Sequence, residues 1–239
     1  MIIFTEILLV LLAYLLGSIP CALIISKTFF NIDIREYGSK NMGATNVLRV
    51  LGLKYGIVVF LMDALKAGLI VLFFRVGLIN QEVYSHIHPL VYGIIAIIGH
   101  LFPIFAKFKG GKGVACAAGI FASYAPLHFL LAISIFIIVF LIFRYVSVAS
   151  LTAVPSSIPI SLILQINGKI DIGLVIFCVV ASIFIIIAHR KNIVRLLTKK
   201  ESKTTMKNKG SIVESAFNKN LTPTFEEKPQ VVIKIKKQK

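Results

Sequence analysis

The sequence has few acidic residues and few cysteines, and it lacks the patterns of several common types of site. Only 10 of its 239 residues are Asp or Glu, against 26 Lys or Arg, which gives a formal net charge of +16. No Gly-x-Ser-x-Gly elbow, plausible Ser/His/Asp triad, or His followed four residues later by Asp is present. Any chemistry would therefore depend on anion binding and orientation rather than on a strong protein nucleophile.

The cysteines do not indicate a metal site or a disulfide. Cys21, Cys116 and Cys178 lie in apolar segments without metal-ligand spacing or an obvious disulfide partner, so we interpret them as small hydrophobic residues. No cluster has a zinc, haem or iron–sulfur pattern, and we expect neither a metal nor a cofactor. We also expect no cleavable signal peptide, because the first apolar segment has no basic residues before it and no small-residue cleavage pattern.

Long apolar segments make up most of the sequence. The chain is 57% hydrophobic, with a mean hydropathy of +0.90, far above the apolar share of a soluble domain. A membrane-crossing helix needs about 20 apolar residues, so the sequence predicts an all-α integral membrane protein. The 30 residues 114–143 would form a helix of about 45 Å, too long for one crossing, and we divide them near Pro126. Seven spans are predicted, at residues 2–26, 55–74, 89–106, 114–127, 129–143, 151–166 and 172–188.

The basic residues indicate the orientation of these spans. Apart from the C-terminal tail, the predicted loops on one side hold nine Lys/Arg, whereas those on the other side hold only Arg75 and Lys169. The positive-inside rule therefore places the N-terminus outside and the C-terminus in the cytoplasm. We divide the chain into a membrane-embedded domain, 1–200, and a basic tail, 201–239, which we expect to be disordered. The tail either lies near anionic headgroups or is simply solvated.

The first polar motif on the inside face covers residues 38–49 and reads Gly-Ser-Lys-Asn-Met-Gly-Ala-Thr-Asn-Val-Leu-Arg. Backbone amides near Gly38 and Gly43, the Ser39 hydroxyl and the Arg49 guanidinium could together bind a phosphate, since a guanidinium can donate two hydrogen bonds to one anion. The alternative is an ordinary cluster of helix caps and turns.

The second motif, residues 99–115, joins two predicted spans and reads Gly-His-Leu-Phe-Pro-Ile-Phe-Ala-Lys-Phe-Lys-Gly-Gly-Lys-Gly-Val-Ala. Gly110, Gly111 and Gly113 would let backbone N–H groups approach an anion closely. A helix that begins just after Gly113 would direct its positive end to the same place, and Lys112 would add a full charge. We interpret this loop as a phosphate-binding loop, with a basic loop of flexible glycines as the alternative.

Two shorter polar motifs, residues 144–150 and 189–195, lie on the same predicted face. His189 and Asn192 are three residues apart and would share a face of a continuing helix; an ordinary surface histidine at a helix C-terminus is the alternative. Asp63 and Lys66 are also three apart, inside a predicted span. We interpret them as a structural ion pair that supports the site, rather than as catalytic groups.

The three longest motifs together resemble those of the bacterial acyl-phosphate:glycerol-3-phosphate acyltransferases, small integral membrane enzymes of phospholipid synthesis. The third of these reads His-Arg-Lys-Asn-Ile-Val-Arg-Leu-Leu, and the resemblance extends over about residues 5–201. Cys116 stands where the family commonly has threonine, Lys199 replaces a usual glycine, and the tail beyond Glu201 is longer than the family needs.

The resemblance implies transfer of a fatty acyl group from acyl phosphate to the 1-hydroxyl of sn-glycerol 3-phosphate, which gives 1-acylglycerol 3-phosphate and phosphate. It also implies a multi-pass protein of the bacterial inner membrane with its active site on the cytoplasmic face. The expected partners are the two substrates, the bilayer and the soluble enzyme that makes acyl phosphate. We expect a monomer that does not bind nucleic acid.

The predicted site has two groups of residues, and the resemblance carries over six of them by position: Ser39, Arg49, Lys112, Ser150, His189 and Asn192. The catalytic residues would be Ser39, Ser150, His189 and Asn192, and the phosphate-binding residues would be Arg49, Lys112, Gly110, Gly111, Gly113, Asn41 and Thr45.

Within that site, the two serines would hydrogen-bond phosphate or polarise the acyl carbonyl, and His189 and Asn192 would orient the acceptor. The proton acceptor is left open between His189, His100 and a substrate phosphate oxygen, and we favour the last. A transporter of a phosphorylated small molecule is the main alternative function. Transporters, however, tend to bind near the bilayer midplane and to show internal repeats, and we find no repeat here. A non-catalytic scaffold would not explain four glycine- and cation-rich loops on one side.

Overall fold

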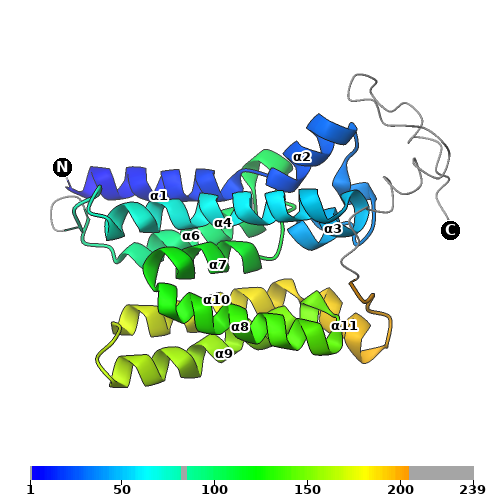
Figure 1. Ribbon diagram of the computed structural model, residues 1–239. Helices are drawn as coiled ribbons and strands as arrows, with labels where there is room; N and C mark the ends of the chain where they lie inside the picture. Colours follow the sequence, from blue (N-terminus) through cyan, green and yellow to red (C-terminus); the bar gives the residue numbers. More distant parts are fainter. Residues whose placement is uncertain (1, 82–84, 205–239) are drawn as a thin grey trace. The chain divides into compact units, whose positions relative to one another are not determined.

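The computed structural model describes residues 2–81 and 85–204, and within them every regular element is a helix (Figure 1). The all-α prediction is therefore confirmed for the described part of the chain. The predicted disordered tail falls almost entirely on residues 205–239, outside the described residues. The α-helices are α1 (Ile2–Ser18), α2 (Cys21–Phe30), α3 (Ala44–Leu51), α4 (Leu53–Arg75), α6 (Pro89–Leu101), α7 (Val114–Tyr124), α8 (Pro126–Phe143), α9 (Val146–Ile166), α10 (Ile172–Ala188) and α11 (Arg190–Leu197). Two short 3₁₀ helices are η1 (Ile34–Glu36) and η2 (Ile104–Ala106).

The described residues divide into two compact units. Unit 1 contains the chain up to Pro20 and residues Leu61–Thr204, and unit 2 contains Cys21–Phe60. Unit 1 thus holds the motif that contains Lys112 and the motif that contains His189, whereas unit 2 holds the motif at residues 38–49.

A proline separates two helices at the break that the sequence predicts near Pro126. α7 ends at Tyr124 and α8 begins at Pro126, with Ala125 between them at φ −137° and ψ 80°. Proline disfavours helical backbone at the residue before it and fits the first position of a new helix. The predicted division of residues 114–143 into two helices is therefore confirmed. Pro20 likewise separates α1, which ends at Ser18, from α2, which begins at Cys21.

The helices include several that are long and apolar enough to cross a bilayer. Four segments qualify by themselves: α4, residues 89–106, α8 and α9. Two bent pairs, α1 with α2 and α10 with α11, raise the number to as many as six if each pair forms one span. α7 is a shorter apolar helix. The chain is therefore a multi-pass membrane protein, while the number of seven spans stays a prediction.

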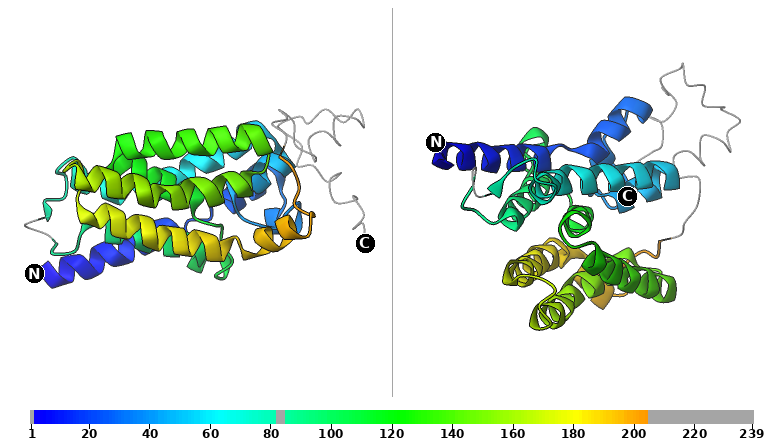
Figure 2. Two further views of the ribbon diagram at one scale, coloured as in Figure 1. Left: turned by 90° about the horizontal axis from the view of Figure 1, so that it is seen from below. Right: turned by 60° about the vertical axis from the view of Figure 1, so that its left-hand side comes forward.

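In unit 1, small residues allow the helices to pack closely. α6 packs against α1, α7 and α10. α9 packs against α8 and α10, and the left view of Figure 2 shows these three helices side by side. A Cβ on Gly17 would clash with the Ala96 backbone of α6, and one on Gly119 would clash with the Ala64 backbone of α4. Small residues at such contacts are typical of membrane helices, because they allow backbones to approach. By contrast, α8 exposes Leu130 and Ile138, each at 57%, as expected of a helix that faces lipid.

Helices α6 to α10 run in alternating directions, so their connections gather at two ends of unit 1. We call one the lysine end, which comprises residues 101–113, 144–147 and 188–204. The other is the aspartate end, which comprises residues 75–81, 85–89, 123–127 and 166–172. In Figure 1 the turn between α9 and α10 lies at the left, whereas α11 lies at the right.

One predicted boundary is wrong. The sequence predicts a polar connection over residues 144–150, but α9 begins at Val146, so the connection contains only Arg144 and Tyr145. The reason is that serine can satisfy its hydroxyl within a helix: Ser150 Oγ donates to the Val146 carbonyl at 2.8 Å. A serine in this setting does not break a membrane helix.

Candidate active site

The lysine end begins with a loop that folds back onto α6. The Gly111 N–H donates to the His100 carbonyl at 3.1 Å. A Cβ on Gly110 would clash with the His100 and Leu101 carbonyls, and one on Gly111 would clash with the His100 ring. The two adjacent glycines therefore have a packing role, since only glycine leaves room for this close return of the chain.

α7 begins directly after this loop, as the sequence predicts. Gly113 is the N-cap of α7, with φ 82°, a backbone conformation that favours glycine. The preceding residue is Lys112, so a lysine ammonium and the positive end of a helix are adjacent in the chain. This combination is suited to binding an anion.

Lys112 contacts the last motif directly. Its Nζ donates to Asn192 Oδ1 of α11 at 2.5 Å. The Asn192 Nδ2 in turn donates to Glu201 Oε1 at 2.7 Å. The structure thus brings together two predicted site residues that are 80 positions apart in the chain, and it adds a carboxylate that fixes the Asn192 amide.

Glu201 connects two helices, α9 and α11, and was not among the predicted site residues. Besides Asn192, its carboxylate accepts hydrogen bonds from Ser147 Oγ of α9 at 3.0 Å and from Arg195 Nε of α11 at 2.6 Å. Burial raises the pKa of this carboxyl, but the three donors and the Arg195 charge outweigh that effect and hold the pKa below its usual value. Nearby, the Thr204 N–H donates to the Arg144 carbonyl at 2.8 Å, so residues 201–204 are attached to the start of α9.

His189 lies at the bend of 60° between α10 and α11 and is 2% exposed. Its Nδ1 is 2.8 Å from the Ile185 carbonyl, which can only accept, so Nδ1 carries the proton. Burial lowers the pKa of His189, and the charge of Lys112 lowers it further, to about 4. At neutral pH the imidazole is therefore uncharged and its Nε2 can accept a hydrogen bond from a hydroxyl.

A buried ion pair within α4 lies close to His100 of α6, the residue onto which the loop folds. Lys66 Nζ is 2.7 Å from Asp63 Oδ1 and donates to the Ile19 carbonyl at 2.6 Å, and both side chains are almost fully buried. His100 Nδ1 is 3.5 Å from the same carboxylate oxygen. Because His100 also packs under Gly111, these charges support the loop from inside the bundle.

In unit 2, Asn46 organises the first motif. Its Oδ1 accepts the Ser39 N–H at 2.8 Å, and its Nδ2 donates to the Tyr37 carbonyl at 3.0 Å and the Ile34 carbonyl at 3.2 Å. The residue is 1% exposed. The interpretation as a cap and turn cluster therefore applies to Asn46, which was not predicted as a site residue.

The predicted site residues of unit 2 belong to the same motif as Asn46. Ser39 is exposed on the turn, and Asn41 precedes α3. Thr45 and Arg49 are four residues apart on α3 and so share one face of that helix. Of the predicted residues in unit 1, Ser150 is buried and donates to its own helix, while Ser147, one turn earlier, contacts Glu201. Among residues 2–81 and 85–204, no three His, Cys, Asp or Glu side chains are grouped as metal ligands would be.

Comparisons with known proteins identify the family to which the chain belongs. Residues 7–199 match the family described as "Glycerol-3-phosphate acyltransferase". A protein of that name from Geobacillus kaustophilus is 42% identical over 204 residues, covering 85% of this chain and 98% of the relative. Another from Bacillus subtilis is 42% identical over 196 residues, covering 82% of this chain and 96% of that relative.

Two solved structures are also similar. The crystal structure of PlsY (YgiH), an integral membrane glycerol 3-phosphate acyltransferase in its glycerol 3-phosphate form, has a TM-score of 0.74 and 39% identity. The match covers 83% of this chain and 95% of the PlsY chain. The lysophosphatidic acid form has a TM-score of 0.71 and 38% identity, with coverage of 84% and 95%.

Proposed function

Because this chain belongs to the glycerol-3-phosphate acyltransferase family, we propose that it acylates the 1-hydroxyl of sn-glycerol 3-phosphate with a fatty acyl group from acyl phosphate. The products are 1-acylglycerol 3-phosphate and inorganic phosphate. The observation that carries the proposal is the contact of Lys112 with Asn192 beside His189, at the start of α7. Both substrates carry phosphate, and this end of unit 1 concentrates groups that bind phosphate.

In this reaction the hydroxyl oxygen of glycerol 3-phosphate attacks the carbonyl carbon of acyl phosphate. The bond between that carbon and the phosphate oxygen breaks, and the hydroxyl proton ends on the departing phosphate. Acyl phosphate is an activated mixed anhydride, so a covalent acyl-enzyme is not required. The protein's contribution is to hold the two substrates together and to stabilise the developing negative charge.

The residues of unit 1 fit separate parts of this task. Lys112 binds a phosphate and is held in place by Asn192, whose orientation depends on Glu201. The uncharged His189 accepts a hydrogen bond from the acceptor hydroxyl through Nε2, and a phosphate oxygen takes the proton. In unit 2, Arg49 binds phosphate and Ser39 hydrogen-bonds it.

We also propose that the chain crosses the membrane seven times, with the lysine end in the cytoplasm, where soluble glycerol 3-phosphate is available. The enzyme acts as a monomer in the inner membrane and receives acyl phosphate from the soluble enzyme that makes it. Lys169→Cys should react with a membrane-impermeant maleimide in intact cells, whereas Lys109→Cys should react only after permeabilisation. The three native cysteines are buried, so background labelling should be low. The reverse pattern would contradict this orientation.

A choice of donors tests the proposed reaction. The purified protein in lipid nanodiscs is given labelled glycerol 3-phosphate with palmitoyl phosphate, palmitoyl-coenzyme A or palmitoyl-acyl carrier protein. We expect labelled lysophosphatidate only with palmitoyl phosphate. Product from a thioester instead would show that the donor assignment is wrong, and no product with any donor would favour the transport alternative, to be tested by uptake of glycerol 3-phosphate into liposomes.

A further inference from the structure

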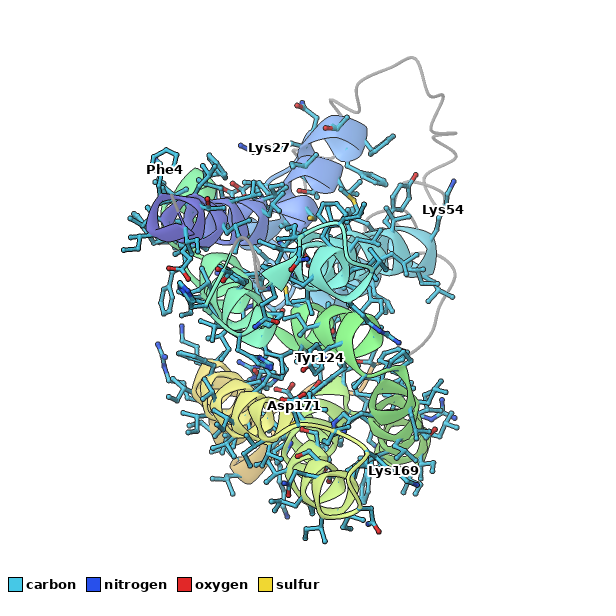
Figure 3. The ribbon with its side chains drawn as sticks, turned by 90° about the vertical axis from the view of Figure 1, so that its left-hand side faces the viewer. Phe4, Lys27, Lys54, Tyr124, Lys169 and Asp171 are labelled. Carbon is cyan, nitrogen blue, oxygen red and sulfur yellow. The ribbon has the colours of Figure 1, made fainter. Side chains whose placement is uncertain are left out.

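A cavity of about 460 Å³ lies at the aspartate end of unit 1. Lys112 lies at the lysine end, where the opposite ends of helices α6 to α10 are connected. It lies between the α7–α8 break and the α9–α10 turn, and its lining includes both charged and apolar side chains. In Figure 3, which views unit 1 from this end, Tyr124 and Asp171 lie next to each other. Nothing in the proposed acyl transfer uses this cavity.

Two cations line the cavity. Arg75 Nη1 donates to the Ser123 carbonyl at 2.9 Å, and Lys169 is exposed on the α9–α10 turn. Within residues 2–81 and 85–204, no carboxylate forms an ion pair with either of them. The lining therefore favours an anion.

The carboxylate that lines the same cavity is already engaged. The Tyr124 hydroxyl donates a short hydrogen bond to Asp171 Oδ2. His88 Nδ1 accepts from the Leu90 N–H at 3.3 Å, so His88 Nε2 carries a proton, and it lies 3.3 Å from Asp171 Oδ1. The same Oδ1 accepts the Leu174 N–H at 3.3 Å. Both oxygens of Asp171 thus have partners other than the two cations.

A buried histidine forms part of the wall of the cavity. His128 lines the cavity from α8 and is 0% exposed, and within residues 2–81 and 85–204 its Nδ1 has no hydrogen-bond partner. Buried polar atoms are nearly always hydrogen-bonded, because an unpaired one loses its interaction with water without compensation. The atom is closed to solvent, so His128 contributes a polar wall and not a ligand contact.

The cavity also adjoins the surface that faces lipid. Leu127 lines it and is 55% exposed, and the neighbouring Leu130 on α8 is 57% exposed. A ligand that placed its anionic group between the cations could extend hydrocarbon along α8. A small soluble anion would leave this apolar side of the cavity uncovered.

We propose that this cavity binds the headgroup of an anionic phospholipid, with its phosphate between Arg75 and Lys169 and its acyl chains along α8. The phosphate is the recognised group, and the lipid belongs to the leaflet at the aspartate end. The site is distinct from the lysine end and does not depend on the proposed acyl transfer.

Native mass spectrometry of the full chain, titrated with phosphatidylglycerol or phosphatidylcholine of identical acyl chains, tests the proposal. We expect the wild type to retain phosphatidylglycerol in preference to phosphatidylcholine. Arg75→Gln/Lys169→Gln should lower the affinity for phosphatidylglycerol about tenfold, since each surface cation contributes a modest attraction to an anionic lipid. Lys199→Gln/Lys200→Gln removes the same charge at the lysine end and should leave the affinity unchanged.

Lys169→Gln alone serves as a second variant, because this side chain is exposed and its loss should not perturb α7. Equal retention of both lipids, or equal losses in the two double variants, would overturn the proposal. Excess inorganic phosphate should not displace the lipid. If phosphate alone bound with the same dependence on Lys169 and displaced the lipid, the ligand would be a soluble phosphate, and the lipid assignment would be wrong.

Discussion

Glu201→Ala should both destabilise the protein and lower its activity. The substitution removes the acceptor of Asn192, Ser147 and Arg195 at once, and the Glu201 side chain is only 3% exposed. Loss of one member of a buried network leaves its partners unpaired, and we expect a cost of about 3 kcal/mol. For a chain of this size, that cost lowers Tm by about 6–12 °C.

The activity should fall through Asn192 rather than through the loss of charge alone. Arg195→Ala is the matched control, because it removes the ion pair with Glu201 and leaves the Asn192–Glu201 hydrogen bond in place. Loss of Arg195 leaves the Glu201 carboxylate, 3% exposed, without its cation, but Asn192 and Ser147 still donate to it, so we expect a smaller cost of about 2 kcal/mol. The assay is initial rate against glycerol 3-phosphate concentration, together with thermal unfolding in the same detergent. A Glu201→Ala protein with the Tm and kcat/KM of the wild type would refute the reasoning.

Two further predictions concern groups buried in unit 1. The pKa of His189 is lowered from 6.5 to about 4, so its stabilising contribution is fully present above pH 6.5 and is lost as the pH falls toward 4. Over this pH range, the Tm of His189→Gln should therefore fall less than the Tm of the wild type. Parallel curves of Tm against pH would contradict the assignment. Asp63→Ala leaves Lys66 buried without its carboxylate and should lower the free energy of unfolding by about 3–5 kcal/mol. Asp63→Ala/Lys66→Met should recover part of that stability. A double variant no more stable than the single one would show that the ion pair is not the cause.

Local signals were sufficient for much of the fold. The break before α8 follows from Pro126, and the start of α7 after Gly113 follows from glycines that precede an apolar segment. The early start of α9 was missed because serine and arginine near a span indicate a loop, although Ser150 satisfies its hydroxyl on its own helix. Polarity alone does not distinguish these two cases.

The site was predictable only where its residues stand in a conspicuous local motif. Lys112 and Asn192 belong to such motifs, and the structure places them in contact. Glu201 stands in a polar segment, and its partner Ser147 is 54 residues away in the chain, so its role depends on how α9 and α11 pack. Asn46 looked like an ordinary polar residue of its motif, because one sequence does not show that its side chain is buried.

The central claim is that Lys112 binds substrate phosphate during acyl transfer. The most direct measurement is phosphate release from palmitoyl phosphate, with and without glycerol 3-phosphate, by the wild type, Lys112→Ala and Lys109→Ala. Lys109 is an exposed lysine of the same loop and serves as the matched control. We predict release that depends on glycerol 3-phosphate and equals lysophosphatidate formation in the wild type and Lys109→Ala, and no release in a folded Lys112→Ala protein. Turnover at the wild-type rate in Lys112→Ala would contradict the account.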